Sequence, residues 1–205
     1  MDLTHLTFFI LVIIPSAILH EWAHAVAADK LGDPTPRLSG RLTLNPIPHI
    51  DPWGTVLLPL LLSVLTRGQF LFAYARPVPF NPLALRWQRW GAAAVGVAGP
   101  LANLIIAFGL GLVVRFAPLS GFGDFLSLVV YANVLLAVFN LVPIPPLDGS
   151  HILFALLPDR WYVFKAWLQQ WGYAILIFFL LFLFDILYPA INLIYYLATG
   201  SSIFG

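Results

Sequence analysis

The chain has 205 residues, of which 60% are hydrophobic and 9% charged, and its formal net charge is +1. A soluble domain carries about 25% charged residues, so a surface this poor in charge predicts a single integral membrane domain over residues 1–205. The near-neutral charge and the lack of a basic tail exclude nucleic acid as a partner. The absence of cysteine excludes disulfides, thiolate metal ligands and a cysteine nucleophile.

Residues 6–28 form the first apolar segment, which is about the ~20 residues that a bilayer span needs. This segment contains the pattern H-E-x-x-H at His20, Glu21 and His24. On a helix, positions i and i+4 share a face, so both imidazoles can bind one Zn²⁺ while the glutamate activates a water. Glu21 is the only glutamate in the chain. Ionisable side chains in an apolar span are costly and indicate a function, so we predict one zinc ion per chain, with Glu21 as the general base.

The segments that follow predict an all-α polytopic membrane protein, a bundle of about four to five transmembrane helices. Further spans are expected at residues 91–116, 124–142 and 172–197, with Asp185 inside the last of them and a short amphipathic stretch at 150–171. Residues 53–66 are apolar but short for a span, which favours a re-entrant segment; whether they span, re-enter or lie at the interface stays open. Residues 41–44 are expected to form a short strand, and residues 68–80 a small surface hairpin. The small residues at the start of span 91–116 predict close packing against another helix.

A catalytic zinc ion needs a third protein ligand and an open position for water. A second glutamate is absent, and the extension of H-E-x-x-H that ends in a further histidine would need one where Lys30 stands. The remaining candidates are the other histidines and the aspartates. Asp148 is the best placed, because it follows the third span beside Gly149 and a run of prolines that can hold a carboxylate rigidly.

Charge bias tests whether Asp148 can reach the histidines, because lysine and arginine mark the cytoplasmic side of a membrane protein. If residues 53–66 do not cross, nine basic residues lie on one side and Arg115 alone on the other. The amino terminus is then outside, and Asp148 emerges on the inner side. His20 and His24 lie ~7–13 Å from the inner end of the first helix. We therefore predict an active site towards the cytoplasm.

Three motifs occur in order along the chain. They are His20-Glu21-x-x-His24, Gly99-Pro100-x-x-Asn103 and Asn140-x-x-Pro143-x-Pro145-Pro146-Leu147-Asp148-Gly149. Together they resemble the site-2 protease family of intramembrane zinc metalloproteases, and residues 41–55 resemble its compact prokaryotic branch. The match covers most of residues 17–153, although Ser150 stands where the family often has a second glycine, and no PDZ or CBS module is present.

The resemblance implies zinc on His20, His24 and Asp148, Glu21 as the general base, and a prokaryotic plasma membrane location. It implies a catalytic core over about residues 6–158, with an extra carboxy-terminal transmembrane segment at about 172–197. The expected activity is hydrolysis of peptide bonds in a transmembrane protein substrate, within the lipid bilayer and near its cytoplasmic side, with a regulatory membrane partner also expected.

Four further polar residues carry weaker predictions. Asn140 is predicted either to hold the substrate backbone or the oxyanion, or to be a helix-packing amide. Asn103 is predicted to pack between helices. His49 is expected to be a surface or packing histidine, with a ligand role as the second alternative. His151 is expected to be a solvated interfacial histidine, with a place behind the metal ligands as the alternative.

Two other functions are compatible with these features. The alternative is a metal-binding but proteolytically inactive regulatory homologue, against which the intact Glu21 argues. A transporter or channel is the third, and the scarcity of intramembrane charge outside one cluster argues against it.

Overall fold

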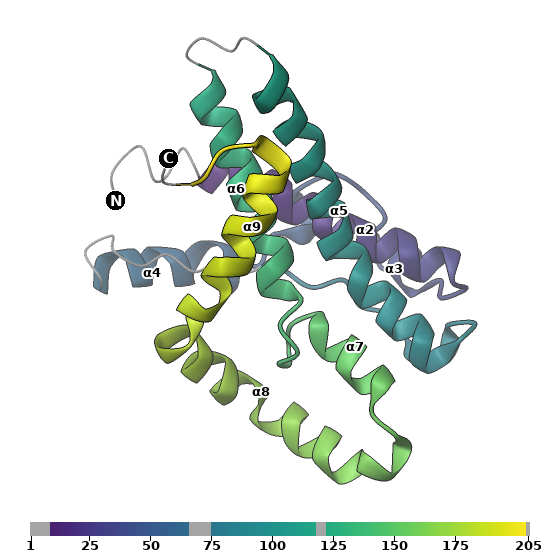
Figure 1. Ribbon diagram of the computed structural model, residues 1–205. Coiled ribbons are helices and arrows are strands. Elements are labelled where there is room, and N and C mark those ends of the chain that lie inside the picture. Colours follow the sequence, from purple (N-terminus) through teal and green to yellow (C-terminus); the bar gives the residue numbers. More distant parts are fainter. Residues whose placement is uncertain (1–8, 66–74, 118–121, 204–205) are drawn as a thin grey trace.

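The computed structural model describes residues 9–65, 75–117 and 122–203, and every regular element in these ranges is a helix (Figure 1). Four segments in these ranges are long and apolar enough to cross a membrane: Leu11–Lys30, Gln88–Phe116, Gly123–Asn140 and Asp159–Phe182. They contain helices α2 (Ile14–Lys30), α5 (Gln88–Phe116), α6 (Gly123–Asn140) and α8 (Tyr162–Phe182). The predicted all-α polytopic architecture is confirmed at this level.

Shorter helices connect and flank these four. They are η1 (Phe9–Ile13), α3 (Thr35–Leu38), η2 (Ile47–His49), η3 (Pro52–Leu57), α4 (Leu58–Leu65), η4 (Pro82–Ala84), α7 (Gly149–Leu156), η5 (Asp159–Trp161), η6 (Phe184–Leu187) and α9 (Tyr188–Thr199). In Figure 1, α4 projects from the bundle at a large angle to α5 and α6. That this apolar segment re-enters the membrane stays a prediction.

The largest buried cluster lies where α5, α6 and α9 meet. Its members are Ala107, Val130, Val134, Ile191, Tyr195 and Ala198. A second buried cluster contains Val142, Leu147, Leu176 and Phe179 and joins the turn after α6 to α8. The first cluster packs the middle of α6 against α5 and α9, and the second packs the turn after α6 against α8. The candidate site lies between α2, α5 and the residue before α7.

Small residues bring α5 close to its neighbours, as the sequence predicted. A Cβ added at Gly96 would lie 2.9 Å from the backbone oxygen of Asp148, and one added at Gly91 would lie 2.9 Å from Cβ of Leu85. At the other end of α5, a Cβ on Gly111 would lie 2.8 Å from backbone atoms of Ala198 in α9. At Gly96 and Gly111 the missing side chain lets two backbones approach closely, and at Gly91 it makes room for the side chain of Leu85.

The expected span over residues 172–197 and the amphipathic stretch over 150–171 are both wrong. Helix α8 begins at Tyr162 and ends at Phe182, and a short turn, η6, separates it from α9. The break has a local cause, because Pro189 has no N–H to donate to the carbonyl of Asp185 four residues earlier. Asp185 is therefore exposed at a bend between two helices, not placed in the middle of a span.

The expected strand at residues 41–44 is also wrong, because these residues are irregular. Side chains capture the local backbone donors there: the N–H of Asn45 donates to Oγ1 of Thr43 at 3.1 Å, and the N–H of Ile47 donates to Oδ1 of Asn45 at 3.1 Å. Such local bonds compete with a sheet ladder. Of the expected hairpin, residues 75–80 have no regular structure and residues 68–74 lie outside the described residues.

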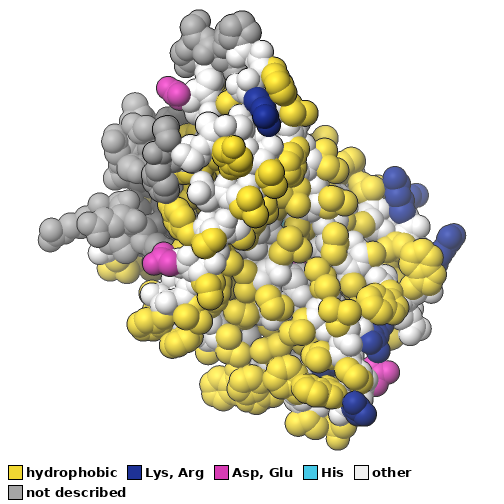
Figure 2. All heavy atoms as spheres, viewed as in Figure 1, with side chains coloured by type: hydrophobic (Ala, Val, Ile, Leu, Met, Phe, Trp, Pro, Cys, Tyr) yellow, Lys and Arg dark blue, Asp and Glu magenta, His cyan; other side chains and the backbone are white. Residues whose placement is uncertain are grey.

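Hydrogen bonds connect the segments that carry most of the lysine and arginine residues at one end of the molecule. The N–H of Arg86 donates to the carbonyl of Leu31 at 2.9 Å, which joins the end of α2 to the start of α5. The guanidinium of Arg89 donates to the carbonyl of Ala155 and lies 3.5 Å from Asp159, which adds the link between α7 and α8. Arg115 lies in the last turn of α5, at the opposite end. Figure 2 shows the same separation: most Lys and Arg side chains lie along one edge of a largely hydrophobic face.

Candidate metal centre

One face of helix α2 is buried and carries both histidines. Ser16, His20, His24 and Ala28 recur every four residues and are all buried. Pro15 occupies the first turn of this helix, which directly follows the π-helical residues of η1. The helix ends after Lys30, where the N–H of Leu31 donates to the carbonyl of Ala27 and the next residue, Gly32, has a φ of +104°. The two histidines therefore face the interior of the bundle from a rigid element.

Asp148 reaches the same place from a tight turn between α6 and α7. The turn is closed by the N–H of Leu147 donating to the carbonyl of Ile144 at 2.8 Å. Gly149 lies so close to the carbonyls of Leu141 and Val142 that an added Cβ would overlap them. The Leu147-Asp148-Gly149 motif thus folds the chain back on the end of α6, and this fold directs the aspartate towards α2.

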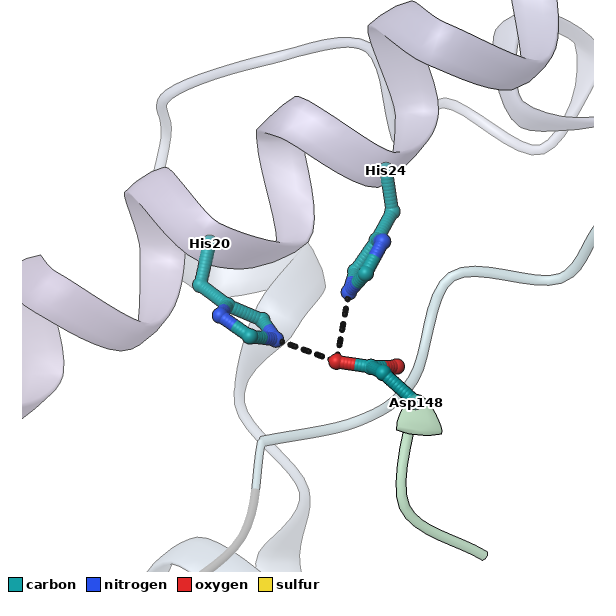
Figure 3. Close-up of side chains that lie close together, drawn as sticks. All are labelled: His20, His24 and Asp148. Atoms are coloured by element: carbon teal, nitrogen blue, oxygen red, sulfur yellow. Dashed lines mark hydrogen bonds and ion pairs between the residues drawn. The ribbon is translucent and has the colours of Figure 1, made fainter. Parts of the chain in front are cut away.

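The three side chains meet at one point (Figure 3). Oδ2 of Asp148 lies 2.9 Å from Nε2 of His20 and 3.2 Å from Nε2 of His24. The imidazole rings are 4.6 Å apart and nearly perpendicular. In the part of the chain that the structure describes, these three residues form one group that could hold a metal ion.

The other nitrogen of each ring determines what this group can bind. Nδ1 of His20 lies 2.5 Å from Oδ1 of Asn103, and Nδ1 of His24 lies 2.7 Å from the carbonyl of Val95. Both partners are oxygen acceptors, so each Nδ1 carries the hydrogen. In a neutral imidazole the lone pair is then on Nε2. Two nitrogen lone pairs and a carboxylate oxygen therefore converge, which is a donor set for zinc.

The space around these atoms also fits a zinc ion. Ligand atoms at about 2.1 Å from a tetrahedral zinc lie roughly 3.4 Å from one another, close to the distances between Asp148 and the two rings. Gly99 of α5 provides the room: an added Cβ would lie 2.6 Å from Nε2 of His20 and closer still to Nε2 of His24.

Glu21 is held by the irregular segment of residues 76–81. The N–H of Val78 donates to Oε2 of Glu21 at 2.9 Å. The segment is fixed at both ends, where the N–H of Arg76 donates to the carbonyl of His49 at 2.9 Å and the N–H of Asn81 to Oδ2 of Asp33 at 2.6 Å. The single glutamate of the chain therefore lies in a defined position beside the group formed by His20, His24 and Asp148.

Asp33, which anchors one end of this segment, is fully buried. Burial raises the pKa of Asp33, but hydrogen bonds from Thr35 and from the N–H of Asn81 outweigh it and hold the pKa below its usual value. The carboxylate is thus charged at neutral pH and accepts all these bonds.

The other residues singled out in the sequence lie around this centre. Asn140 is the last residue of α6 and donates to its own helix, at the carbonyl of Leu136. His151 packs edge-to-face on Phe80, and burial lowers its pKa, so it is neutral. His49 is buried and bonds to the carbonyl of Thr43 at 2.9 Å, as a packing histidine does.

Asn103 was interpreted too narrowly, because it contacts His20 directly as well as packing between helices. Sequence reasoning also missed Asn133, Ser16 and Val78. An amide in an apolar span is a signal that could have singled out Asn133; no local signal distinguishes Val78, which contributes only its backbone N–H.

Comparison with known proteins agrees with this geometry. The model of peptidase family M50 matches residues 115–183. The chain is 35% identical to "Putative zinc metalloprotease YwhC" of Bacillus subtilis, over 93% of this chain and 88% of that protein. It is 33% identical to "Putative zinc metalloprotease Rip2" of Mycolicibacterium smegmatis, over 87% of this chain and 70% of that protein. No solved structure matches. With a relative this similar along nearly its whole length, and a site of zinc-binding chemistry between membrane-spanning helices, the chain belongs to peptidase family M50, the site-2 protease family of zinc metalloproteases.

Proposed function

We propose that His20, His24 and Asp148 hold one zinc ion and that Glu21 is the general base for hydrolysis of peptide bonds in membrane-embedded protein substrates. One observation carries this proposal: three lone-pair atoms from α2 and the start of α7 converge within 4.8 Å of one another, beside the one glutamate of the chain. A structural histidine pair would not need both Nε2 atoms directed at a carboxylate.

Zinc supplies a Lewis acid that polarises a carbonyl and lowers the pKa of water to about 7. The protein residues supply the rest. Glu21 accepts a proton from the attacking water at its carboxylate and delivers it to the amide nitrogen that leaves. The N–H of Val78 holds one carboxylate oxygen at 2.9 Å, so the other oxygen is the one that moves the proton. Asn140 remains a candidate for holding substrate backbone, although its bond to Leu136 favours the packing alternative.

The depth of the site supports a membrane-embedded substrate. His24 and His20 lie six and ten residues before the end of α2, which is about 9 and 15 Å along a helix. A soluble peptide would have to enter the apolar region to reach them. A transmembrane substrate already lies at that depth, and it must unwind locally, because a helix hides its carbonyls.

The proposed orientation places the site towards the cytoplasm and the amino terminus outside. The site lies towards the carboxy-terminal end of α2. This is the basic end of the molecule, which carries Lys30, Arg86, Arg89 and Arg160. Basic residues favour the cytoplasmic side. The bacterial relatives support a prokaryotic plasma membrane. The catalytic core then spans residues 6–158, within one domain.

Replacing Glu21 with glutamine tests the proposed reaction. The Glu21→Gln protein is expected to retain one zinc per chain, because glutamine has the same shape and is not a ligand, and to lose at least about 100-fold of its cleavage rate, since general-base catalysis contributes that much or more. The measurement pairs zinc content with cleavage of a co-expressed single-span membrane protein.

The Asp148→Ala protein is the control, and it should lose both zinc and cleavage. Undiminished cleavage by Glu21→Gln would reject the role of Glu21. Full zinc content in the wild type and in Glu21→Gln, lost in Asp148→Ala, without cleavage by the wild type would instead support an inactive metal-binding homologue.

A further inference from the structure

A buried polar network lies behind His20, on the side away from the zinc-binding nitrogens. It consists of Ser16 in α2, Asn103 in α5 and Asn133 in α6, none more than 4% exposed. Buried polar groups are costly between membrane-spanning helices unless they are hydrogen-bonded. Each of these side chains bonds to another of the three, so the network is satisfied from within.

Backbone carbonyls determine which way the first amide points. The amide nitrogen of Asn133 donates to the carbonyl of Val129 at 2.9 Å and to Oγ of Ser16 at 3.0 Å. A backbone carbonyl can only accept, so the nitrogen must occupy that side. The oxygen of Asn133 therefore faces the amide nitrogen of Asn103, at 2.8 Å.

The orientation of Asn103 follows from the same reasoning. Its amide nitrogen donates to the oxygen of Asn133 and lies 3.3 Å from the carbonyl of Ser16. Both partners are acceptors, so the amide oxygen of Asn103 has to face the other way. It lies 2.5 Å from Nδ1 of His20. A chain of hydrogen bonds, called the relay below, thus runs from the backbone of α6 through Asn133 and Asn103 to the imidazole of His20. The orientation of each amide determines the orientation of the next group.

We propose that Asn103 and Asn133 are positioning residues for the metal centre. Asn103 holds His20 as the tautomer with hydrogen on Nδ1 and directs the Nε2 lone pair to the zinc. Asn133 acts at one remove, by holding Asn103 in the required orientation. This inference rests on the proposed role of His20 as a zinc ligand.

The second histidine shows that the relay is particular to His20. Nδ1 of His24 donates to a backbone carbonyl, that of Val95, at 2.7 Å. Among the described residues, no side chain bonds to Nδ1 of His24. Amide substitutions should therefore weaken one ligand of the three and leave the other two in place, so zinc binding should fall partially, not vanish.

The test measures zinc affinity of the purified full chain by competition with a chelator, together with the absorption spectrum of the cobalt(II) form. Asn103→Leu is expected to weaken zinc binding about 10- to 100-fold, which is typical for loss of a partner behind a metal ligand. Asn133→Leu should weaken it in the same direction, by a smaller factor, although Asn133 does not touch His20. Both should shift the cobalt spectrum, and Asn103→Asp, which keeps an oxygen for Nδ1, should bind zinc more tightly than Asn103→Leu.

Thr199→Val is the matched control, because Thr199 is also a buried polar residue and bonds to the carbonyl of Tyr195 in α9. It should leave zinc affinity and the cobalt spectrum unchanged, whatever it does to stability. If Asn103→Leu does not fold, Asn103→Ala replaces it in the same comparison.

Zinc affinities of the Asn103 and Asn133 variants within twofold of wild type would overturn the proposal. So would a decrease that Thr199→Val reproduces at equal loss of apo-protein stability. Unchanged zinc binding by His20→Ala would instead contradict the proposed function, because His20 would then not be a ligand.

Discussion

Gly99 shows at the scale of one residue how closely the backbone approaches the metal centre. It lies within α5, where glycine costs roughly 1 kcal/mol relative to alanine. A single added carbon would lie under 3.0 Å from Nε2 of both histidines. The missing side chain therefore provides the volume that a metal ion would fill.

The substitution Gly99→Ala is expected to reduce bound zinc from one per chain to nearly none, because the methyl group would occupy the metal position. Gly109→Ala, in the same helix, is the matched control, since its Cβ would meet nothing within 4 Å. Zinc content by elemental analysis of the two purified proteins decides the matter. Wild-type zinc content in Gly99→Ala would show that the metal lies elsewhere.

At the scale of elements, α9 packs against both α5 and α6 at the end of the bundle away from the candidate metal centre. Ile191, Tyr195 and Ala198 of α9 lie in the same buried cluster as Ala107 of α5 and Val130 of α6. The contact between α5 and α9 is closest at Gly111, which faces backbone atoms of Ala198. Backbone cannot move aside as a flexible side chain can, so this pair sets the distance between the two helices.

We expect Gly111→Ala to destabilise the folded protein by about 1–3 kcal/mol, the usual effect of overpacking. Gly109→Ala should be neutral or stabilise by up to about 1 kcal/mol, because it removes a helix-interior glycine without a clash. Unfolding of each protein in mixed micelles by a denaturing detergent measures the difference. Equal stabilities would mean that α9 does not pack at Gly111 in solution.

At the scale of the whole molecule, most basic residues lie at one end, which is the end that we propose faces the cytoplasm. The end of α2 and the end of α7 are joined to the start of α5 by the bonds of Arg86 and Arg89. The opposite end carries Arg115 and the exposed Asp124. Helix α5 has 29 residues, about 44 Å at 1.5 Å per residue, enough to separate these ends by a full bilayer.

The chain has no cysteine, so a single introduced cysteine reports the side of the membrane on which it lies. Ser39→Cys, in the loop after α3, should react with a membrane-impermeant maleimide only after the cells are opened. Asp124→Cys, at the start of α6, should react in intact cells. The reverse pattern would place the basic end outside and contradict the proposed orientation.

The sequence by itself determined the features that depend on neighbours along the chain. The spacing of His20 and His24 places them on one face of any helix, and the charge bias predicted that Asp148 would lie on the same side. The lack of a second glutamate and of cysteine left few candidates for the third ligand. The break between α8 and α9 also has a local cause, since Pro189 removes a helical hydrogen bond. It was not predicted, because the apolar composition continues through the break.

Only the tertiary structure decided which residues support the site. Val78 reaches Glu21 from 57 positions away, and Asn133 reaches Ser16 from 117. In a soluble helix the apolar stripe would mark the buried face, but here the lipid-facing and buried positions are both apolar. Helices in a bilayer pack through small residues and single hydrogen bonds, which leave no periodic pattern in the sequence. For this reason the three residues of the candidate metal centre could be named from motifs, whereas the amides behind His20 and the glycine in front of it required the packed helices.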